Sequence, residues 1–254
     1  MRRVVFNKKG GVGKTSIVCN LAAVAAARGR RTLVVDLDPQ SDSTRYLLGE
    51  KAPETAPTLK DYYQDSLGFS LFGERALGDF VHPTGARRLD LLPAHRELDG
   101  IEDKLQARYK IFKLRDGLAK LDYDEVFIDT PPALGFFTMS ALVAAERCLI
   151  PFDCDDFSRH ALYLLNGHVR EVAADHNPGL AIEGIVVNQF DSRARLPQRL
   201  IDELEGEGFH LLRPFLSSSV KLRESHQAGK PLVQLAPRHK LTGQFEELYD
   251  NLKG

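Results

Sequence analysis

Short apolar runs recur along the chain, and most of them are continuous rather than alternating with polar residues. A strand that is buried on both faces carries apolar side chains at nearly every position, whereas a strand with one face exposed to solvent alternates apolar and polar residues. Each run is rich in Val, Ile, Leu or Phe. The pattern therefore predicts buried strands at residues 4–6, 32–36, 89–93, 125–129, 148–152, 185–188 and 211–212.

Helical patterns occupy the intervals between these runs. The first candidate, residues 15–28, is followed by Gly29, which is suited to end a helix. Alternation of strands and helices is typical of an α/β fold with right-handed crossovers. We expect a mostly parallel, twisted sheet of about seven or eight strands with helices on both faces. The further helices are predicted at residues 97–121, 138–146, 158–175, 195–206 and 220–228.

The least regular stretch is residues 50–88, which is rich in Pro and polar residues and reads as loop with short helices. There is no internal repeat and no low-complexity tract. A chain of 254 residues can build one α/β domain with a sizeable core. We expect residues 1–254 to form a single domain with no helix-turn-helix domain before it.

The composition indicates which binding partners and which cellular compartment to expect for this protein. The 34 basic and 35 acidic residues nearly cancel, so binding to DNA or to a membrane would need a local patch. Cys19, Cys148 and Cys154 lie in apolar segments without a CxxC pair, which indicates small buried side chains in a reducing compartment. No signal peptide or membrane-spanning run is apparent, so we expect a cytoplasmic protein.

The segment KKGGVGKTS, residues 8–16, lies directly between the first predicted strand and the first predicted helix, as a phosphate-binding loop does. Its glycines let successive N–H groups point at phosphate oxygens, and the helix N-terminus adds its dipole. Lys14 can reach the β- and γ-phosphates, and Thr15 can offer its hydroxyl to Mg²⁺. The residues expected to contact nucleotide are Lys9, Gly10, Gly11, Val12, Gly13, Lys14, Thr15 and Ser16.

Carboxylates follow two later strands. Asp36 and Asp38 end the second strand, and Asp129 ends VFID. Ligands of open parallel sheets bind at the carboxyl ends of the strands, so all three should lie near Lys14. Asp129 fits a Walker B carboxylate that holds Mg²⁺. If the strand continues through Asp36 and Asp38, both could face the phosphates, and one could orient the attacking water. The alternative is that they cap the next helix.

Taken together, KGGVGKT, DLDPQ and DTPP resemble the ParA/MinD family of deviant Walker-A ATPases, over nearly the whole chain. LLPAHRELDGIEDKL and VKLRESHQAGKPL are similar to segments of small, Soj-like ParA partition proteins. The resemblance implies a P-loop fold, ATP and Mg²⁺ as cofactors, and slow ATP hydrolysis. It also implies an ATP-driven homodimer in which Lys9, the signature lysine, reaches the partner's phosphates; the alternative is a solvated loop lysine. For Lys8 we expect a solvated charge and no role.

Further roles follow from the same resemblance. Asp38 aligns with the residue that positions or activates the hydrolytic water, so Lys9, Lys14 and Asp38 are the expected catalytic residues. Asp36 would support the Mg²⁺ shell together with Thr15 and Asp129. Asn188 matches an asparagine that reads the adenine edge, although a strand-end turn residue is also consistent with its position.

ParA-type relatives bind DNA without sequence preference, and such binding needs Lys and Arg near phosphates. Arg193 and Lys221 stand where related proteins carry DNA-contacting arginines. Ser218 replaces another expected arginine, which weakens the patch by one contact. Ordinary solvated helix charges are the alternative for each cation. The basic residues of the two segments concerned are Arg193, Arg195 and Arg199, and Lys221, Arg223 and Lys230.

The implied function is a partition or positioning ATPase on the nucleoid, released from DNA by a ParB-like activator. One alternative is a MinD-like membrane ATPase. However, the tail is predicted to form a helix with an apolar stripe on one side and an acidic face on the opposite side. Anionic lipid would repel the acidic face, so the apolar stripe should dock on the protein's own core. The stripe comprises Leu241, Phe245, Leu248 and Leu252, and the acidic face Glu246, Glu247 and Asp250.

A second alternative is a synthetase or kinase that activates a small acid on the same fold. Such an enzyme would need a second pocket with dedicated polar residues, which the sequence does not identify. An iron–sulfur reductase fits less well, because Cys148 and Cys154 flank a buried strand and do not resemble cluster ligands.

Overall fold

The computed structural model describes residues 1–49, 52, 57–68, 74–154 and 158–252. Its centre is an eight-stranded sheet with the order β3-β4-β2-β5-β1-β6-β7-β8. Among the strands of the described residues, only β3 is antiparallel to its neighbour, and all other pairs are parallel. The strands are β1 (Arg2–Val5), β2 (Thr32–Asp36), β3 (His82–Pro83), β4 (Leu89–Leu92), β5 (Glu125–Asp129), β6 (Arg147–Asp153), β7 (Ala181–Asn188) and β8 (Leu211–Leu212).

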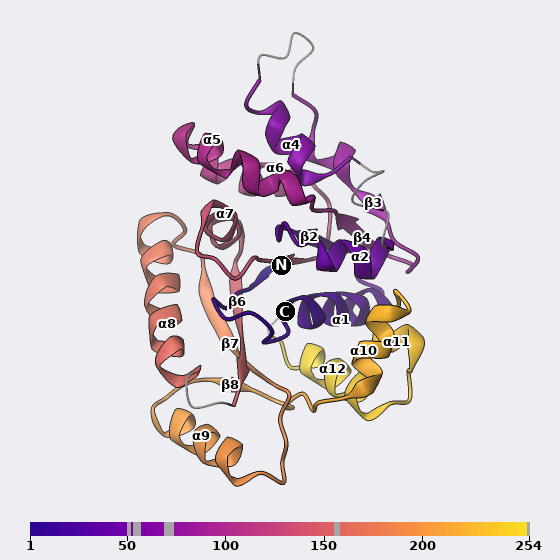
Figure 1. Ribbon diagram of the computed structural model, residues 1–254, viewed down its shortest axis with the longest axis vertical. Helices are drawn as coiled ribbons and strands as arrows, with labels where there is room; N and C mark the ends of the chain where they lie inside the picture. Colours follow the sequence, from indigo (N-terminus) through magenta and orange to yellow (C-terminus); the bar gives the residue numbers. More distant parts are fainter. Residues whose placement is uncertain (50–51, 53–56, 69–73, 155–157, 253–254) are drawn as a thin grey trace.

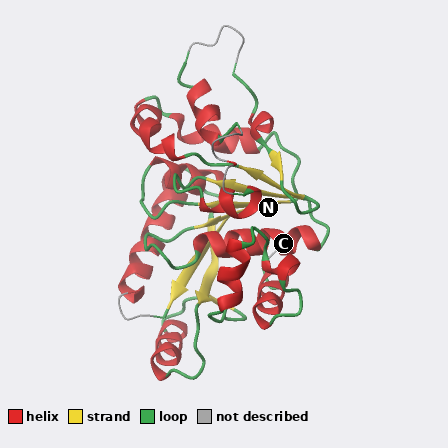
Figure 2. Ribbon diagram, turned by 45° about the vertical axis from the view of Figure 1, so that its right-hand side comes forward, coloured by secondary structure: helices red, strands yellow, loops and turns green. Residues whose placement is uncertain are grey.

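Helices cover both faces of this sheet (Figure 1, Figure 2). The α-helices are α1 (Lys14–Ala27), α2 (Asp42–Leu48), α4 (Leu59–Asp65), α5 (Glu102–Ala107), α6 (Lys113–Leu118), α7 (Phe136–Ala144), α8 (Ser158–Asp175), α9 (Arg195–Gly206), α10 (Val220–Gln227), α11 (Leu232–Leu235) and α12 (Lys240–Asp250). The 3₁₀ turns are η1 (Leu77–Phe80), η2 (Arg96–Ile101) and η3 (Lys110–Phe112). The expected mostly parallel α/β fold is confirmed.

The continuous apolar strands serve two cores, one on each face of the sheet. Successive residues alternate between them: Val126 and Ile128 pack with α4 to α8, whereas Phe127 packs with α1 and α12. All three are buried. Each such side chain contributes about 1.5–3 kcal/mol of burial. Because both faces are covered, most strand positions are apolar, and the side chains of the functional site begin where the strands end.

The single helix predicted over 97–121 is wrong. The structure replaces it with η2, α5, η3 and α6. The α-helix stops at Arg108, because Tyr109 has φ 55°, a left-handed conformation that no interior residue of a right-handed helix adopts. The antiparallel β3 and the helices α2 and α11 are additional elements, whereas α4 and η1 lie in residues 50–88, where short helices were expected. The other five predicted helices and Gly29, with φ 89° after α1, agree within about two residues.

The C-terminal stripe docks as expected. Leu241, Phe245, Leu248 and Leu252 are buried, and α12 packs against α1. None of the helices in the described ranges is both long and apolar enough to span a bilayer. Cys19 and Cys148 are buried as predicted, whereas Cys154 is half-buried.

Candidate functional site

The loop between β1 and α1 is held in a shape that only glycine allows at two positions. Gly11 and Gly13 have φ values of 77° and 92°. Gly13 also packs against Asn188, where an added Cβ would lie 2.2 Å from the amide nitrogen. Helix α1 begins at the next residue, so its first unpaired N–H groups open toward the space in front of the loop. This is the geometry of an anion-binding site.

A cleft of about 680 Å³ lies in front of this loop. Its volume is in the range of pockets for small molecules and cofactors. The loop contributes Gly10, Gly11, Gly13, Lys14, Thr15 and Ser16 to the lining; the far wall comprises Asp38, Gln40, Asp42, Arg45, Tyr46, Pro132, His226 and Gln227. The cleft therefore unites the predicted phosphate loop with Asp38.

Lys14 lies at the base of the cleft and is largely buried. Its Nζ donates to the carbonyl oxygen of Lys9 at 3.2 Å. Burial lowers the pKa of Lys14, while the negative charges of Asp129 and Asp38 act in the opposite direction. A bound phosphate would stabilise the charged ammonium group in place of the water that burial removes from it.

Asp129 has one satisfied oxygen and one unsatisfied oxygen. Its Oδ2 accepts hydrogen bonds from Thr15 Oγ1 and Ser43 Oγ, each at 2.7 Å. Among the described residues, Oδ1 is the buried side-chain nitrogen or oxygen atom that lacks a hydrogen-bond partner. Burial raises the pKa of Asp129 to about 6. An unsatisfied carboxylate oxygen beside a threonine hydroxyl fits a hard cation such as Mg²⁺, which takes oxygen ligands.

Asp36 and Asp38 occupy different environments. β2 ends at Asp36, so the strand does not continue through both residues, and only Asp38 lines the cleft. Asp36 is fully buried, and its Oδ2 accepts from the N–H of Thr44 at 2.8 Å and from the Thr44 hydroxyl at 2.6 Å. Burial, followed by the charge of Asp129, raises the pKa of Asp36. The expected shared orientation is thus not met, and a metal role for Asp36 stays a prediction.

Asp38 accepts a hydrogen bond from the N–H of Gln40 at 2.9 Å. Burial raises its pKa. Its place in the cleft wall is compatible with contact to a water molecule near a terminal phosphate.

Lys9 is held within its own subunit. Its Nζ lies 2.7 Å from Asp153 Oδ2, at the end of β6, and 37 % of its side chain is exposed. An ion pair this exposed contributes about 1 kcal/mol or less, so it can open at little cost. Lys8, for which no role was expected, lies 2.8 Å from His168 Nε2 on α8. The reach of Lys9 into a second subunit stays a prediction.

Asn188 supports the loop from beneath. Its Nδ2 donates to the carbonyl of Val12 at 2.9 Å, and the next residue, Gln189, donates to the carbonyl of Gly11 at 3.2 Å. Asn188 is buried and is not part of the cleft lining. A role in reading adenine stays a prediction, whereas support of the loop is an additional function of this side chain.

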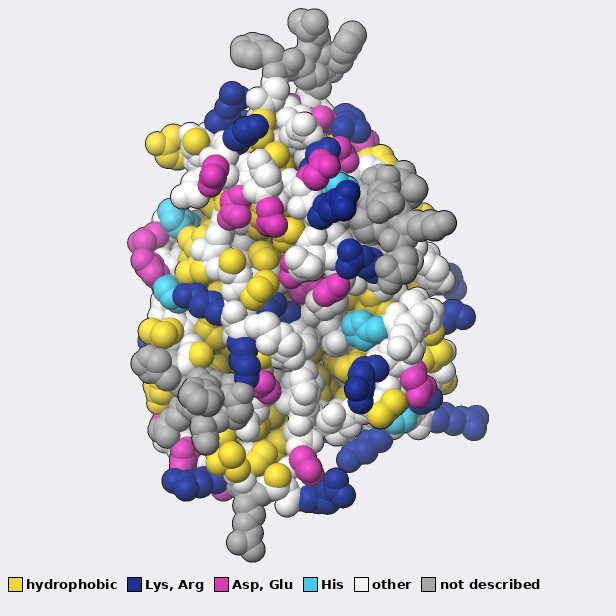
Figure 3. Space-filling model, in the orientation of Figure 1, with side chains coloured by type: hydrophobic (Ala, Val, Ile, Leu, Met, Phe, Trp, Pro, Cys, Tyr) yellow, Lys and Arg dark blue, Asp and Glu magenta, His cyan; other side chains and the backbone are white. Residues whose placement is uncertain are grey.

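The candidate DNA-binding cations lie on and before α9, on α10 and, for Lys230, just after α10, at the bottom and the right of Figure 1. Several are paired with carboxylates: Arg193 with Asp191, Arg199 with Glu203, and Lys221 with Glu224. Arg223, Lys230 and Ser218 are exposed. The side chain of Arg195 lies outside the described residues. Figure 3 shows Lys and Arg side chains at the lower right of this face.

Sequence reasoning missed Ser43, Thr44, Tyr46, Asp153 and His226. Ser43 and Thr44 follow Asp38 in a polar run that could have been read as the start of a helix. Asp153 ends a strand, as Asp129 does. Tyr46 and His226 gave no local signal, because they meet only through the fold.

A family model described as "AAA domain" matches residues 3–182. The chain is 36 % identical to the chromosome partitioning protein ParA of Myxococcus xanthus over 90 % of its length and 79 % of that protein. It is 33 % identical to the sporulation initiation inhibitor protein Soj of Bacillus subtilis, over 92 % of this chain and 90 % of Soj.

Among solved structures, the chain is similar to cobyrinic acid a,c-diamide synthase from Mycobacterium smegmatis with bound ATP analogue and magnesium. The TM-score is 0.83 and the identity 28 %, over 98 % of this chain and 92 % of that one.

Proposed function

Because the chain belongs to the ParA/Soj family of partition ATPases, we propose that it is an ATP-dependent partition or positioning ATPase. Its cycle comprises ATP-driven dimerisation, binding to DNA without sequence preference, and release after hydrolysis. A ParB-like protein stimulates the slow hydrolysis. The protein acts in the cytoplasm on the nucleoid, as a single domain over residues 1–254.

The observation that supports this proposal most strongly is the unsatisfied Oδ1 of Asp129 beside the Thr15 hydroxyl. Thr15 and Asp129 would hold Mg²⁺, which would supply positive charge to offset that of the triphosphate. The loop N–H groups and Lys14 bind the triphosphate. Asp38 orients the attacking water from the cleft wall.

Dimerisation involves Lys9. A triphosphate carries more negative charge than Lys14 and Mg²⁺ remove, so a second cation stabilises it. Lys9 leaves Asp153 and reaches the phosphates held by the partner subunit. A ligand bound by both subunits stabilises the dimer by mass action, and hydrolysis weakens it.

The test is retention on random-sequence DNA with ATP, with ADP and without nucleotide, at one fixed salt concentration. We expect retention with ATP alone, together with a dimer by light scattering. Retention that is equal in all three states would contradict the proposal. In the variant Lys9→Ala, nucleotide binding should persist and the ATP-driven dimer should disappear; an undiminished dimer fraction would refute the role of Lys9.

Asp38→Ala tests the hydrolysis step separately. This variant should accumulate as the ATP dimer, because the water is no longer oriented. Turnover at the wild-type rate would show that another group performs that task.

The likeness to a diamide synthase favours one competing function, the activation of a small carboxylic acid. The two are distinguished by phosphate release. A partition ATPase releases phosphate with no acid or amine added and is stimulated by DNA plus its partner protein. A synthase requires the acceptor.

A further inference from the structure

Helix α2 is attached at its inner end to both buried carboxylates of the site. The Ser43 hydroxyl donates to Asp129, and Thr44 donates to Asp36 through its N–H and its hydroxyl. All four side chains are buried. Any change in what Asp129 contacts would therefore act directly on the first turn of α2.

One turn further on, the same helix is attached to α10. Tyr46 is 2 % exposed, and its hydroxyl lies 2.8 Å from Ser225 Oγ. Its ring stacks on His226 with a centroid separation of 4.0 Å and an angle of 14° between the planes. Asn20 of α1 donates to the same hydroxyl at 3.4 Å. Tyr46 thus joins α2 to α10 by a hydrogen bond and by a ring contact.

α10 also contacts the phosphate loop directly. His226 Nε2 lies 2.9 Å from Ser16 Oγ, and His226 forms part of the cleft wall. Ser16 follows Thr15 at the start of α1, where a bound nucleotide would lie. The helix is therefore connected to the phosphate loop through His226 and, through Tyr46 and α2, to Asp129.

The remaining part of α10 carries the candidate DNA contacts. Arg223 is exposed, and Lys221 is partly exposed and paired with Glu224. α10 has eight residues, about two turns, in one hydrogen-bonded helix, so we expect it to move as one unit. A shift of Ser225 and His226 must therefore also shift Lys221 and Arg223.

We propose that Tyr46 and His226 are positioning residues that couple the nucleotide state of the cleft to the orientation of Lys221 and Arg223 on α10. The inference rests on the proposed function, because it requires ATP-dependent DNA binding. Neither residue needs to touch DNA. Their effect is on the coupling ratio, defined as DNA affinity with a non-hydrolysable ATP analogue divided by DNA affinity without nucleotide.

The experiment compares Tyr46→Phe and His226→Ala with the wild type at one salt concentration. We expect the coupling ratio to fall about fivefold or more in each variant, with the analogue-driven dimer intact by light scattering. By reciprocity, the effect of DNA on analogue affinity should fall by the same factor. His226→Gln retains a donor within reach of Ser16 and should recover part of the ratio.

Two controls separate coupling from stability and from direct contact. Tyr249→Phe makes the same change on α12, away from α2 and α10, and should leave the ratio unchanged. Arg193→Gln removes a candidate DNA contact that lies outside α10, and it should lower DNA affinity in both states and leave the ratio unchanged. A parallel thermal melt shows that each variant is folded.

The outcomes are distinct. A wild type without analogue-dependent DNA binding contradicts the proposed function itself. A wild type with that dependence, together with unchanged ratios in Tyr46→Phe and His226→Ala, overturns the coupling inference alone. A ratio that falls only because the dimer is lost also overturns it, since the defect then lies in assembly.

Discussion

β1, β5 and β7 carry charged or polar side chains near both of their ends, and the two ends are built differently. At the amino end, Arg3 lies between Glu125 and Glu183. At the carboxyl end, the same strands lead to the phosphate loop, to Asp129 and to Asn188. Both clusters are buried. The two clusters are therefore similar in burial and differ in how their charged groups are paired.

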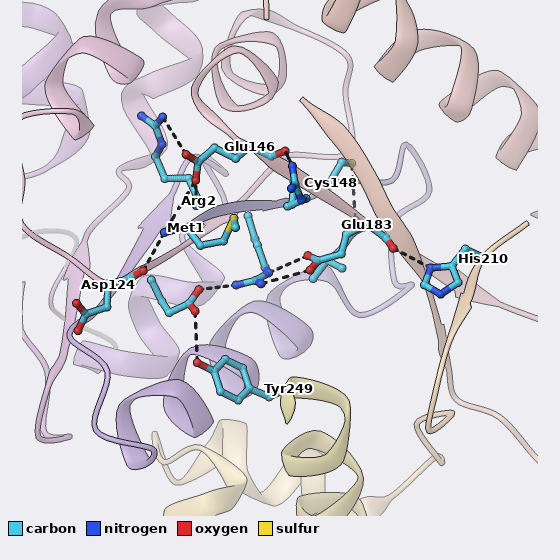
Figure 4. Close-up of polar contacts among 12 residues, drawn as sticks. Met1, Arg2, Asp124, Glu146, Cys148, Glu183, His210 and Tyr249 are labelled. Atoms are coloured by element: carbon cyan, nitrogen blue, oxygen red, sulfur yellow. Dashed lines mark hydrogen bonds and ion pairs between the residues drawn. The ribbon is translucent and has the colours of Figure 1, made fainter. Parts of the chain in front are cut away.

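At the amino end, the carboxylates have donors within the chain. Arg3 Nε donates to Glu183 Oε2 at 2.8 Å, its Nη1 donates to Glu125, and Tyr249 donates to Glu125 at 3.4 Å. Figure 4 shows Glu183 and Tyr249 pointing toward this centre, with His210 on the carbonyl of Glu183. Removal of Arg3 would leave two buried carboxylates without its positive charge, so the cluster is structural.

At the carboxyl end, burial raises the pKa of Asp36, Asp38 and Asp129 and lowers the pKa of Lys14. Asp129 Oδ1 has no donor. Charges that destabilise the apo protein in this way persist where a ligand offsets them. In this molecule, therefore, pairing rather than burial distinguishes a structural charge cluster from a functional one.

The largest expected effect comes from breaking the amino-end cluster. Arg3→Met leaves Glu125 and Glu183 buried together, which should lower the free energy of unfolding by about 3–5 kcal/mol in urea denaturation. Nucleotide affinity per folded molecule should not change. Arg3→Met combined with Glu125→Gln and Glu183→Gln should recover part of the loss; equal destabilisation of the single and triple variants would contradict the explanation.

The opposite response is expected at the other end. Lys14→Ala should weaken binding of a fluorescent ATP analogue by about 100-fold or more, since it removes a charged contact to phosphate. The free energy of unfolding without nucleotide should change by less than about 1 kcal/mol, because the ammonium is already poorly solvated. A large loss of stability with unchanged affinity would reverse the assignment of the two ends.

A pH series sharpens the contrast. The pKa of Asp129 is about 6 in the folded protein and about 4 when unfolded, so between these values the folded state binds more protons. The free energy of unfolding without nucleotide and Mg²⁺ should fall by up to about 3 kcal/mol as the pH rises from 4 to about 6.

Asp129→Asn should reduce this slope and stabilise the apo protein above about pH 6 by roughly 1–3 kcal/mol. The slope is not abolished, because burial also raises the pKa of Asp36 and Asp38. The same variant should lose its Mg²⁺-dependent stabilisation by nucleotide. An unchanged pH profile, measured by thermal melts, would show that Asp129 does not titrate in this range.

The smallest effect is expected for Tyr249→Phe. The Tyr249 hydroxyl is 3.4 Å from Glu125, and Arg3 also donates to that carboxylate, so its loss should cost about 0.5 kcal/mol. Urea denaturation measures this value. A cost similar to that of Arg3→Met would show that Tyr249, rather than Arg3, holds the cluster together.

The parts that the sequence predicts are those set by local pattern. Strand interiors buried on both faces require continuous apolar runs, and the glycine spacing of residues 10–13 identifies the loop. The helix at 97–121 was overestimated, because its apolar spacing continues across the left-handed Tyr109. Tyr46 and His226 are 180 positions apart in the sequence and meet only in the folded protein, so their contact has no local sequence signature. Likewise, the separation of Asp36 from Asp38 depends on where β2 ends.

The close fit of Gly13 against Asn188 has a consequence for anyone who redesigns this protein. The loop is held by residues more than 170 positions further along the chain: Asn188 and Gln189, at and directly after the end of β7, donate hydrogen bonds to its carbonyl oxygens. Residues 8–16 transferred to another scaffold without these two hydrogen bonds would keep the sequence of the motif but not its backbone conformation. Residue 13 should remain glycine in any functional variant, whatever residue stands at position 188, because its φ of 92° favours glycine.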